Sequence, residues 1–217
     1  MMVSTQTPST NPEEKNFDQF NIFHTPIWGY VLREHHYPAF DYVDYILNLK
    51  SARPSLSKSN FGGWHSDCNL FDHDIFKELS SDILSIAKQS LSSFLNTRYS
   101  EVSGGSPNLR FTEMWANVNT KTNFNAHHIH EGILSGVFYL KVPENSGRLI
   151  LSNPAVRSDA HYIRCKDYAV DPERLALIFF PSWLMHYVEP SNNDEERISI
   201  SFNIDSTDWP PPSVAGE

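Results

Sequence analysis

Apolar residues along the chain follow two different spacings, a helical one in the first half and a strand-like one in the second. They recur at helical intervals over residues 40–49 and 72–97, which predicts one helix in the first segment and one or two in the second. After Pro107, short runs separated by turn residues predict strands at residues 109–119, 127–142, 148–152, 175–180, 186–189 and 197–204. Helices followed by antiparallel strands indicate an α+β domain with a β-barrel or sandwich core.

Two segments before this barrel region have their own signals. Residues 22–32 read as an edge strand interrupted by Pro26, since proline cannot donate a hydrogen bond to a β-ladder. The run Gly62-Gly63-Trp64 predicts a loop.

No internal repeat or linker divides the chain, so we expect a single domain over residues 17–204. Its helices should lie mostly within 38–99 and its barrel strands mostly within 109–204. Residues 1–16 are rich in Ser, Thr, Pro and Asn, which predicts a disordered or loosely attached N-terminus. Residues 205–217 are expected to form a C-terminal tail.

Charge and aromatic content narrow the classes of partner. The 217 residues include 17 Lys and Arg against 26 Asp and Glu, a formal net charge of −9, and no basic run. This balance argues against general binding to nucleic-acid backbones. Aromatic residues make up 13% of the chain, which favours a β-rich core or an aromatic-lined pocket.

Nothing in the sequence predicts a membrane or secreted protein. No apolar run reaches the ~18–20 residues that cross a bilayer, and residues 1–15 lack the apolar stretch of a signal peptide. The two cysteines, Cys68 and Cys165, are far apart and are expected to be reduced thiols. We therefore expect a cytoplasmic protein without membrane contact.

Three histidines form the main candidate for chemistry. His128 and His130 are two residues apart, so on an extended strand both side chains would point to the same side. His186 follows a Phe-Phe-Pro turn where another strand would enter the barrel. Imidazoles at three corners of a metal, with the other positions open, suit Fe(II), Zn(II) or Cu(II).

The identity of the third ligand is open at this point. A two-His, one-carboxylate site would have Asp or Glu at position 130, where this chain has His130. Glu131 is adjacent, but strand alternation would turn it away unless a bulge intervenes. The hypothesis that follows from three neutral ligands is a metal that binds a dianionic co-substrate more strongly and is itself retained more weakly.

Polar residues on two predicted strands are candidates for binding a carboxylate. Arg197 and Ser199 share one face of a cleanly alternating strand, and Arg can grip a carboxylate through two parallel hydrogen bonds. Tyr139 could add a hydroxyl from a neighbouring strand. Asn117 and Asn119 share a face of residues 109–119 and could bind the co-substrate or the substrate. Metal ligands beside such a group suggest an iron oxygenase that uses a 2-oxo acid.

The motifs together resemble a bacterial and phage family of 2-oxoglutarate/Fe(II)-dependent oxygenases of unassigned substrate. The Gly62-Gly63-Trp64-His65-Ser66 segment also looks like the glycine-tryptophan segment of this family. The resemblance spans most of residues 20–204. It is carried by His-Ile-His at 128–130, Ser-Gly-Val-Phe-Tyr at 135–139, Phe-Pro-Ser-Trp-Leu-Met-His-Tyr-Val-Glu-Pro at 180–190 and Glu-Arg-Ile-Ser-Ile-Ser-Phe-Asn at 196–203.

This resemblance implies a double-stranded β-helix (jelly-roll) core with flanking N-terminal helices. It implies Fe(II) held by His128, His130 and His186, and 2-oxoglutarate held by Arg197 with Ser199. The expected reaction uses O2, converts 2-oxoglutarate to succinate and hydroxylates a C–H bond of a small molecule or protein side chain. The setting would be a bacterial cell or a phage-infected host.

Two other functions compete with this interpretation. A three-His dioxygenase of cupin type would use no 2-oxo acid, although the Glu expected four or five residues after the second His is absent, since Leu134 and Ser135 stand there. A non-catalytic jelly-roll module with an incidental metal is the other alternative. An exposed jelly-roll edge could also pair two copies into a homodimer.

Overall fold

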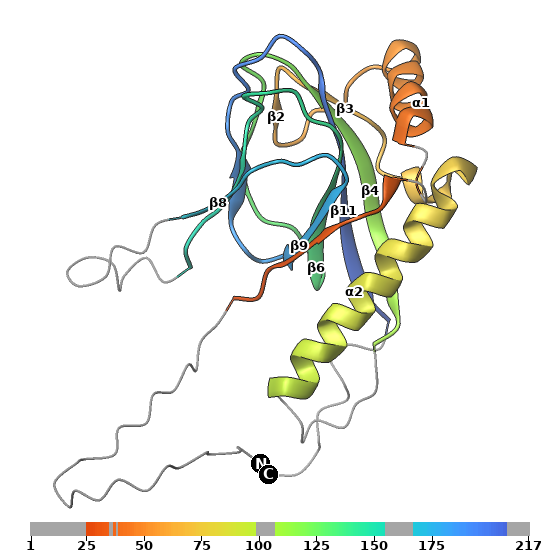
Figure 1. Cartoon of the computed structure of the whole chain (residues 1–217), viewed down its shortest axis with the longest axis vertical. Coiled ribbons are helices and arrows are strands. Elements are labelled where there is room, and N and C mark those ends of the chain that lie inside the picture. The colour runs from red at the N-terminus through yellow and green to blue at the C-terminus, as the bar shows by residue number, and fades with distance from the viewer. Residues whose placement is uncertain (1–24, 35–36, 38, 99–106, 155–166, 208–217) are drawn as a thin grey trace, which may run out of the picture.

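The computed structural model describes residues 25–34, 37, 39–98, 107–154 and 167–207, which form two facing β-sheets with helices on one side (Figure 1). The predicted N-terminal segment 1–16 and most of the predicted tail lie outside these residues. The larger sheet, called sheet A here, has the strand order β1-β9-β6-β11-β4-β3. The smaller one, sheet B, has the order β2-β5-β10-β7-β8.

Sheet A is built around three long strands at its centre, and all its ladders are antiparallel. Strand β11 pairs on one side with β4 and on the other with β6. The alternating pattern that predicted strands at 109–119 and 197–204 is confirmed, with the second strand two residues longer. The strands of sheet A are β1 Trp28–Val31, β3 Trp64–His65, β4 Leu109–Asn119, β6 Leu134–Lys141, β9 Ala176–Pro181 and β11 Arg197–Ser206.

Sheet B consists of short antiparallel strands. The single strand predicted over 127–142 is wrong in one respect: the chain forms two strands there, one in each sheet. Gly132 lies between them with a φ of +101°, a backbone conformation that other residues rarely adopt. The strands of sheet B are β2 Asn60–Phe61, β5 Phe124–His128, β7 Leu149–Leu151, β8 Tyr168–Val170 and β10 His186–Val188.

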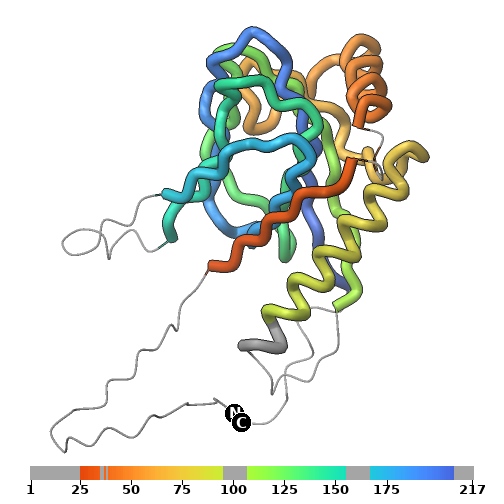
Figure 2. Tube along the Cα trace, viewed as in Figure 1, coloured from red at the N-terminus to blue at the C-terminus, as the bar shows by residue number. Residues whose placement is uncertain are grey.

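The helices cover the outer face of sheet A (Figures 1 and 2). Helix α1 (Ala39–Ala52) contacts β6, and helix α2 (Lys77–Arg98) contacts β4. The second predicted helix is one continuous α-helix, preceded by the short 3-10 turns η2 (Leu70–Asp72) and η3 (Asp74–Phe76). No helix within the described ranges is long and apolar enough to cross a membrane.

The apolar core is divided between two places. The main cluster lies between sheet A and the helices and includes Ile46, Ile83, Phe138 and Phe202, all fully buried. A smaller cluster between the two sheets includes Leu151 and other residues from sheet A and sheet B. The remaining space between the sheets is lined by polar side chains together with apolar ones such as Leu149 and Phe180, and this is where the candidate site lies.

Candidate active site

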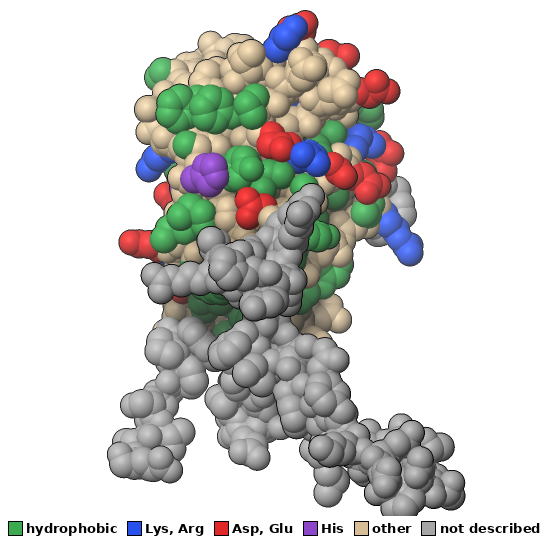
Figure 3. Space-filling model, turned by 90° about the vertical axis from the view of Figure 1, so that its left-hand side faces the viewer, with side chains coloured by type: hydrophobic (Ala, Val, Ile, Leu, Met, Phe, Trp, Pro, Cys, Tyr) green, Lys and Arg blue, Asp and Glu red, His purple; other side chains and the backbone are tan. Residues whose placement is uncertain are grey.

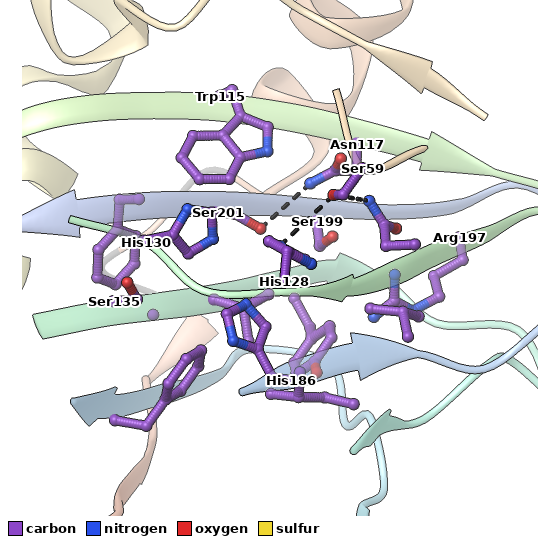
Figure 4. A pocket seen from close by; sticks show the side chains of 18 residues that line it. Ser59, Trp115, Asn117, His128, His130, Ser135, His186, Arg197, Ser199 and Ser201 are labelled. Carbon is purple, nitrogen blue, oxygen red and sulfur yellow. Dashed lines mark hydrogen bonds between the residues drawn. The ribbon is translucent and has the colours of Figure 1, made fainter. Parts of the chain in front are cut away.

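Neighbouring strands of sheet B hold two of the three histidines opposite each other. His128 ends β5 and His186 begins β10, and the two residues are direct partners in the antiparallel ladder. Their ring centroids are 4.3 Å apart. His130 joins them, so that one nitrogen atom from each ring lies within 4.8 Å of the others. The predicted meeting of His128, His130 and His186 is therefore what the structure contains (Figure 4).

Backbone carbonyls orient two of these rings. His128 Nδ1 lies 2.6 Å from the carbonyl oxygen of Ala126, and His186 Nδ1 lies 2.8 Å from that of Leu184. A carbonyl only accepts hydrogen bonds, so Nδ1 must be the protonated nitrogen in both rings. Nε2 of each ring is then left with a free lone pair, which is the arrangement typical of metal-binding histidines.

His130 lies beyond the end of β5, so strand alternation is not what turns its ring toward the other two. Its backbone N–H donates to the carbonyl oxygen of Ser182 at 3.0 Å, and Ser182 belongs to the turn that leads to His186. This contact ties the irregular segment to the loop carrying the third histidine. Glu131, the alternative ligand, is exposed and lies outside the histidine cluster.

Burial keeps the three rings neutral. Loss of hydration lowers the pKa of His186 to about 3 and that of His130 to about 4, and mutual repulsion with neighbouring histidines adds to this effect. The pKa of His128 is also lowered, mainly by burial. Neutral imidazole is the form that binds metal, so the cluster is in its ligating form at neutral pH.

Sheet A places a set of polar side chains opposite the histidines. In the ladders around β11, Ser199 is the direct partner of Asn117 on β4 and of Tyr139 on β6. Arg197 lies two residues before Ser199 on the same face, and all four residues line one compartment. The long strands thus bring the predicted carboxylate-binding groups together by register alone.

Arg197 is the most unusual of these residues because it is a charged residue with only 3% exposure. It forms no ion pair with a described residue, and its Nε has no hydrogen-bond partner among them. Its guanidinium lies over the Tyr139 ring, 5.0 Å from the centroid. A buried cation is costly unless it is paired, so this arrangement fits an anionic ligand.

Two further buried polar atoms in the same compartment lack partners. They are the hydroxyl of Tyr139 and Oδ1 of Asn117. Burial raises the pKa of Tyr139, so it stays a hydroxyl that can donate to a carboxylate. Nδ2 of Asn117 donates to Oγ of Ser201 at 3.1 Å, which fixes the orientation of the amide. The Tyr139 hydroxyl can donate to a carboxylate of 2-oxoglutarate, whereas Oδ1 of Asn117 is an acceptor that could take a hydrogen bond from a ligand donor.

The predicted site residue Asn119 lies outside the compartment, whereas Asn125 and Ser59 line it. Asn119 is buried, but its amide faces Asn125 at 3.5 Å and does not line the compartment. Asn125 donates to Oγ of Ser59, which lies 3.5 Å from Nε2 of His128. Ser59 precedes the two-residue strand β2, and no pattern in its own segment of the sequence indicates that it would approach a histidine.

The site consists of two adjoining compartments that share the residues around His128 and His130. The inner one, about 520 Å³ including space open to solvent, contains the polar groups of sheet A (Figure 4). The outer one, about 900 Å³ on the same measure, opens toward the surface. Two of the three histidines therefore line both compartments, and His186 lines the inner one.

Similarity to known proteins agrees with this geometry. Residues 113–203, which contain the three histidines and the polar groups of β11, match the family described as "Putative 2OG-Fe(II) oxygenase". No curated protein sequence matches the chain.

Several solved structures share the fold, among them the following three. A prolyl-4-hydroxylase from Pseudomonas putida is 16% identical, with 82% of this chain and 91% of that chain covered and a TM-score of 0.53. The viral collagen prolyl hydroxylase of Paramecium Bursaria Chlorella virus-1, in a 2OG complex, is 13% identical, with 82% and 94% covered and a TM-score of 0.52. HygX from Streptomyces hygroscopicus, with nickel, 2-oxoglutarate and hygromycin B bound, is 11% identical, with 84% of each chain covered and a TM-score of 0.57.

These likenesses confirm the predicted fold class, an α+β protein with a double-stranded β-helix core. The family match over the site indicates an enzyme of the 2-oxoglutarate- and Fe(II)-dependent oxygenase class. Its cofactors are Fe(II), 2-oxoglutarate and O2.

Proposed function

We propose that the protein is a hydroxylase in which sheet B holds the iron and sheet A holds 2-oxoglutarate. The bound iron would supply O2 activation coupled to decarboxylation of 2-oxoglutarate to succinate. His128, His130 and His186 would ligate it, Arg197 and Ser199 would bind a carboxylate, and Tyr139 and Asn117 would complete the polar wall. Asn119 would act indirectly, by fixing Asn125.

The observation that carries this proposal is the buried, unpaired Arg197 in the same compartment as the three histidines. A protein gains nothing from an uncompensated buried charge, so an anion must offset it when the site is in use. A 2-oxo acid has a carboxylate for the guanidinium and a second polar end for the metal. A cupin-type dioxygenase uses no 2-oxo acid, so it would need a different anion at this place.

The third ligand in this proposal is His130 and not Glu131. Glu131 is exposed, whereas His130 has its ring centroid 4.8 Å from that of His128 and 5.1 Å from that of His186. A carboxylate ligand at this position would cancel part of the positive charge of the metal ion. Three neutral imidazoles leave the full positive charge on the metal, which favours an anionic co-substrate.

The proposal also includes the family, the cellular setting and the oligomeric state of the protein. The pattern of residues around the three histidines supports the bacterial and phage family named above, and a cytoplasmic setting fits the free thiol of Cys68. Pairing of copies into a homodimer through a sheet edge is part of the proposal as well.

Consumption of 2-oxoglutarate without added substrate tests the proposed roles. Fe(II)-loaded protein in air should convert 2-oxoglutarate slowly to succinate, and Arg197→Ala should lose this activity by about 100-fold because it lacks the carboxylate partner. Arg148→Ala is the matched control, since Arg148 is an exposed residue paired with Glu189. Equal succinate formation by wild type and Arg197→Ala would contradict the proposal.

A further inference from the structure

The outer compartment has a chemistry of its own that the proposed binding of iron and 2-oxoglutarate does not use. Its wall includes Trp115, His65 and Glu113, with Lys58 and Phe61 also lining it. His65 comes from the Gly-Gly-Trp-His segment, which is part of the family resemblance but has no role in the proposed binding of iron or 2-oxoglutarate. The compartment adjoins His128 and His130, so a molecule within it would lie beside the proposed metal.

His65 presents an unpaired acceptor to this compartment. Its side chain is 3% exposed, and its ring stacks on Trp115 with centroids 5.4 Å apart and planes 9° from parallel. Nδ1 lies 2.6 Å from the carbonyl oxygen of Ser66 and must therefore be the donor. Nε2 is left as an acceptor with no hydrogen-bond partner among the described residues.

Glu113 adds a fixed negative charge on the same wall. It lies on the same face of β4 as Trp115, and Nδ2 of Asn203 donates to its Oε2 at 2.9 Å. Asn203 in turn accepts from Oγ of Ser135 at 2.8 Å, so the carboxylate is held by a buried network. Asn203 uses one carboxylate oxygen, and the thiol of Cys68, which lines the same compartment, is a hydrogen-bonding neighbour of the Glu113 carboxylate.

We propose that the outer compartment is the substrate site and that it selects molecules carrying a cationic nitrogen next to a flat or apolar group. The nitrogen would donate to the carboxylate of Glu113 and to Nε2 of His65, and the flat group would lie against Trp115. Hydrogen bonds in which one partner is charged are stronger than bonds between neutral groups. Because Glu113 and Nε2 of His65 both accept hydrogen bonds, a neutral or anionic analogue should bind more weakly than a cationic one. This inference rests on the proposed function for the identity of the neighbouring site.

Lys58 is the one cation in this wall, but its side chain is exposed at the rim. Solvent and salt screen its charge, whereas Glu113 is half-buried and keeps more of its effect. A substrate with an additional anionic group at the far end would be tolerated. Selection by charge should therefore come from Glu113.

Two probes of similar shape test the inference by calorimetric titration of the full-length, metal-free protein at neutral pH. Benzylamine and benzyl alcohol share a ring and differ in the charge next to it. Wild type should bind the amine about tenfold more tightly than the alcohol. Glu113→Gln should remove this preference, since glutamine keeps an acceptor for Asn203 but has no charge.

Two further variants make the result specific. His65→Phe keeps a flat ring against Trp115 but removes the acceptor, and it should reduce the preference for the amine severalfold. Glu131→Gln, a matched removal of charge outside both compartments, should leave the preference intact. Equal affinity for amine and alcohol, unchanged preference in Glu113→Gln, or no binding of either probe would overturn the inference.

Because these titrations use neither iron nor 2-oxoglutarate, their failure is distinguishable from failure of the proposed function. Succinate formation that depends on Arg197, combined with no preference for the amine, would remove only the substrate inference. Loss of that dependence with the preference intact would leave a charge-selective pocket and remove the assignment of the neighbouring compartment.

Discussion

The two sheets that enclose the site differ in strand length and in what covers them. The central strands of sheet A, β4 and β11, have 11 and 10 residues and lie under the helices. The strands of sheet B have between two and five residues. On the side where β8 lies in Figure 1, hydrophobic side chains reach the surface beside charged ones (Figure 3).

This difference corresponds to two ways of holding a functional group. In sheet A, cross-strand pairing along the long strands buries Arg197 and fixes its polar neighbours. In sheet B, His128 and His186 lie at strand ends, where the carbonyls of Ala126 and Leu184 orient their rings. Long strands thus suit a charge that must stay buried, and strand ends suit ligands that need an oriented lone pair.

The largest expected effect comes from removing a histidine of sheet B. His186→Ala should weaken Fe(II) binding by more than about 100-fold, because loss of a ligand exceeds the effect of losing its supporting hydrogen bond. Anaerobic competition with a coloured chelator measures this affinity. His127→Ala is the control, since His127 is exposed and stacks on Tyr187. An equal loss of Fe(II) affinity in both variants would contradict the assignment of the metal ligands to the histidine cluster.

Removing the buried cation of sheet A should change co-substrate binding and stability in opposite directions. Arg197→Met should bind 2-oxoglutarate about 100-fold more weakly while retaining iron. The ligand-free variant should be more stable than wild type by about 1–4 kcal/mol, because an uncompensated charge is replaced by an apolar side chain. Urea unfolding without ligands measures the second effect, and a less stable variant would argue that Arg197 has a partner in the free protein.

The close packing of sheet A predicts a difference between two glycines. A Cβ at Gly136 would lie 2.5 Å from both the Ile178 carbonyl oxygen and the Phe202 ring, whereas one at Gly29 would meet its nearest neighbour at 3.5 Å. Gly136→Ala should therefore cost about 1–3 kcal/mol of unfolding free energy. Gly29→Ala should be close to neutral. Thermal and urea unfolding measure the stability of both variants, and an equal loss of stability in the two would contradict this expectation.

The pH dependence from sheet B is the smallest effect when it is measured over a single pH unit. The folded-state pKa of His186 is about 3, below the unfolded value of 6.5, so the unfolded chain takes up protons first as pH falls. Stability of the metal-free protein should be fully present above pH 6.5 and decline below it. His186→Gln should reduce this decline by about 1.4 kcal/mol per pH unit. Urea unfolding of both proteins at a series of pH values measures the slopes, and identical slopes would contradict burial of a neutral ring.

The regular parts of the molecule could be predicted from the sequence, and the irregular parts could not. Strict alternation along β11 marks which face carries Arg197 and Ser199, because side-chain direction in a strand has a period of two. His130 was expected on the strand with His128, yet it lies beyond the strand end and is held by a backbone contact with Ser182. That contact joins distant segments and has no local signal.

Short elements were missed for a related reason. Strands β2 and β3 have two residues each and were expected to be part of a loop, since two residues show no periodicity. These strands bring Ser59 near His128 and place His65 against Trp115. The outer compartment therefore depends on tertiary contacts, whereas the inner one follows largely from strand register.

The most direct test of the central claim, that the two sheets supply the two halves of one site, is an anaerobic titration of Fe(II)-loaded protein with 2-oxoglutarate. The visible metal-to-ligand charge-transfer band reports binding of the oxo acid to the metal. The account predicts a saturable band in wild type that is absent in His186→Ala and needs far more 2-oxoglutarate in Arg197→Ala, which still holds iron. A wild-type protein that holds iron but gives no band would contradict it.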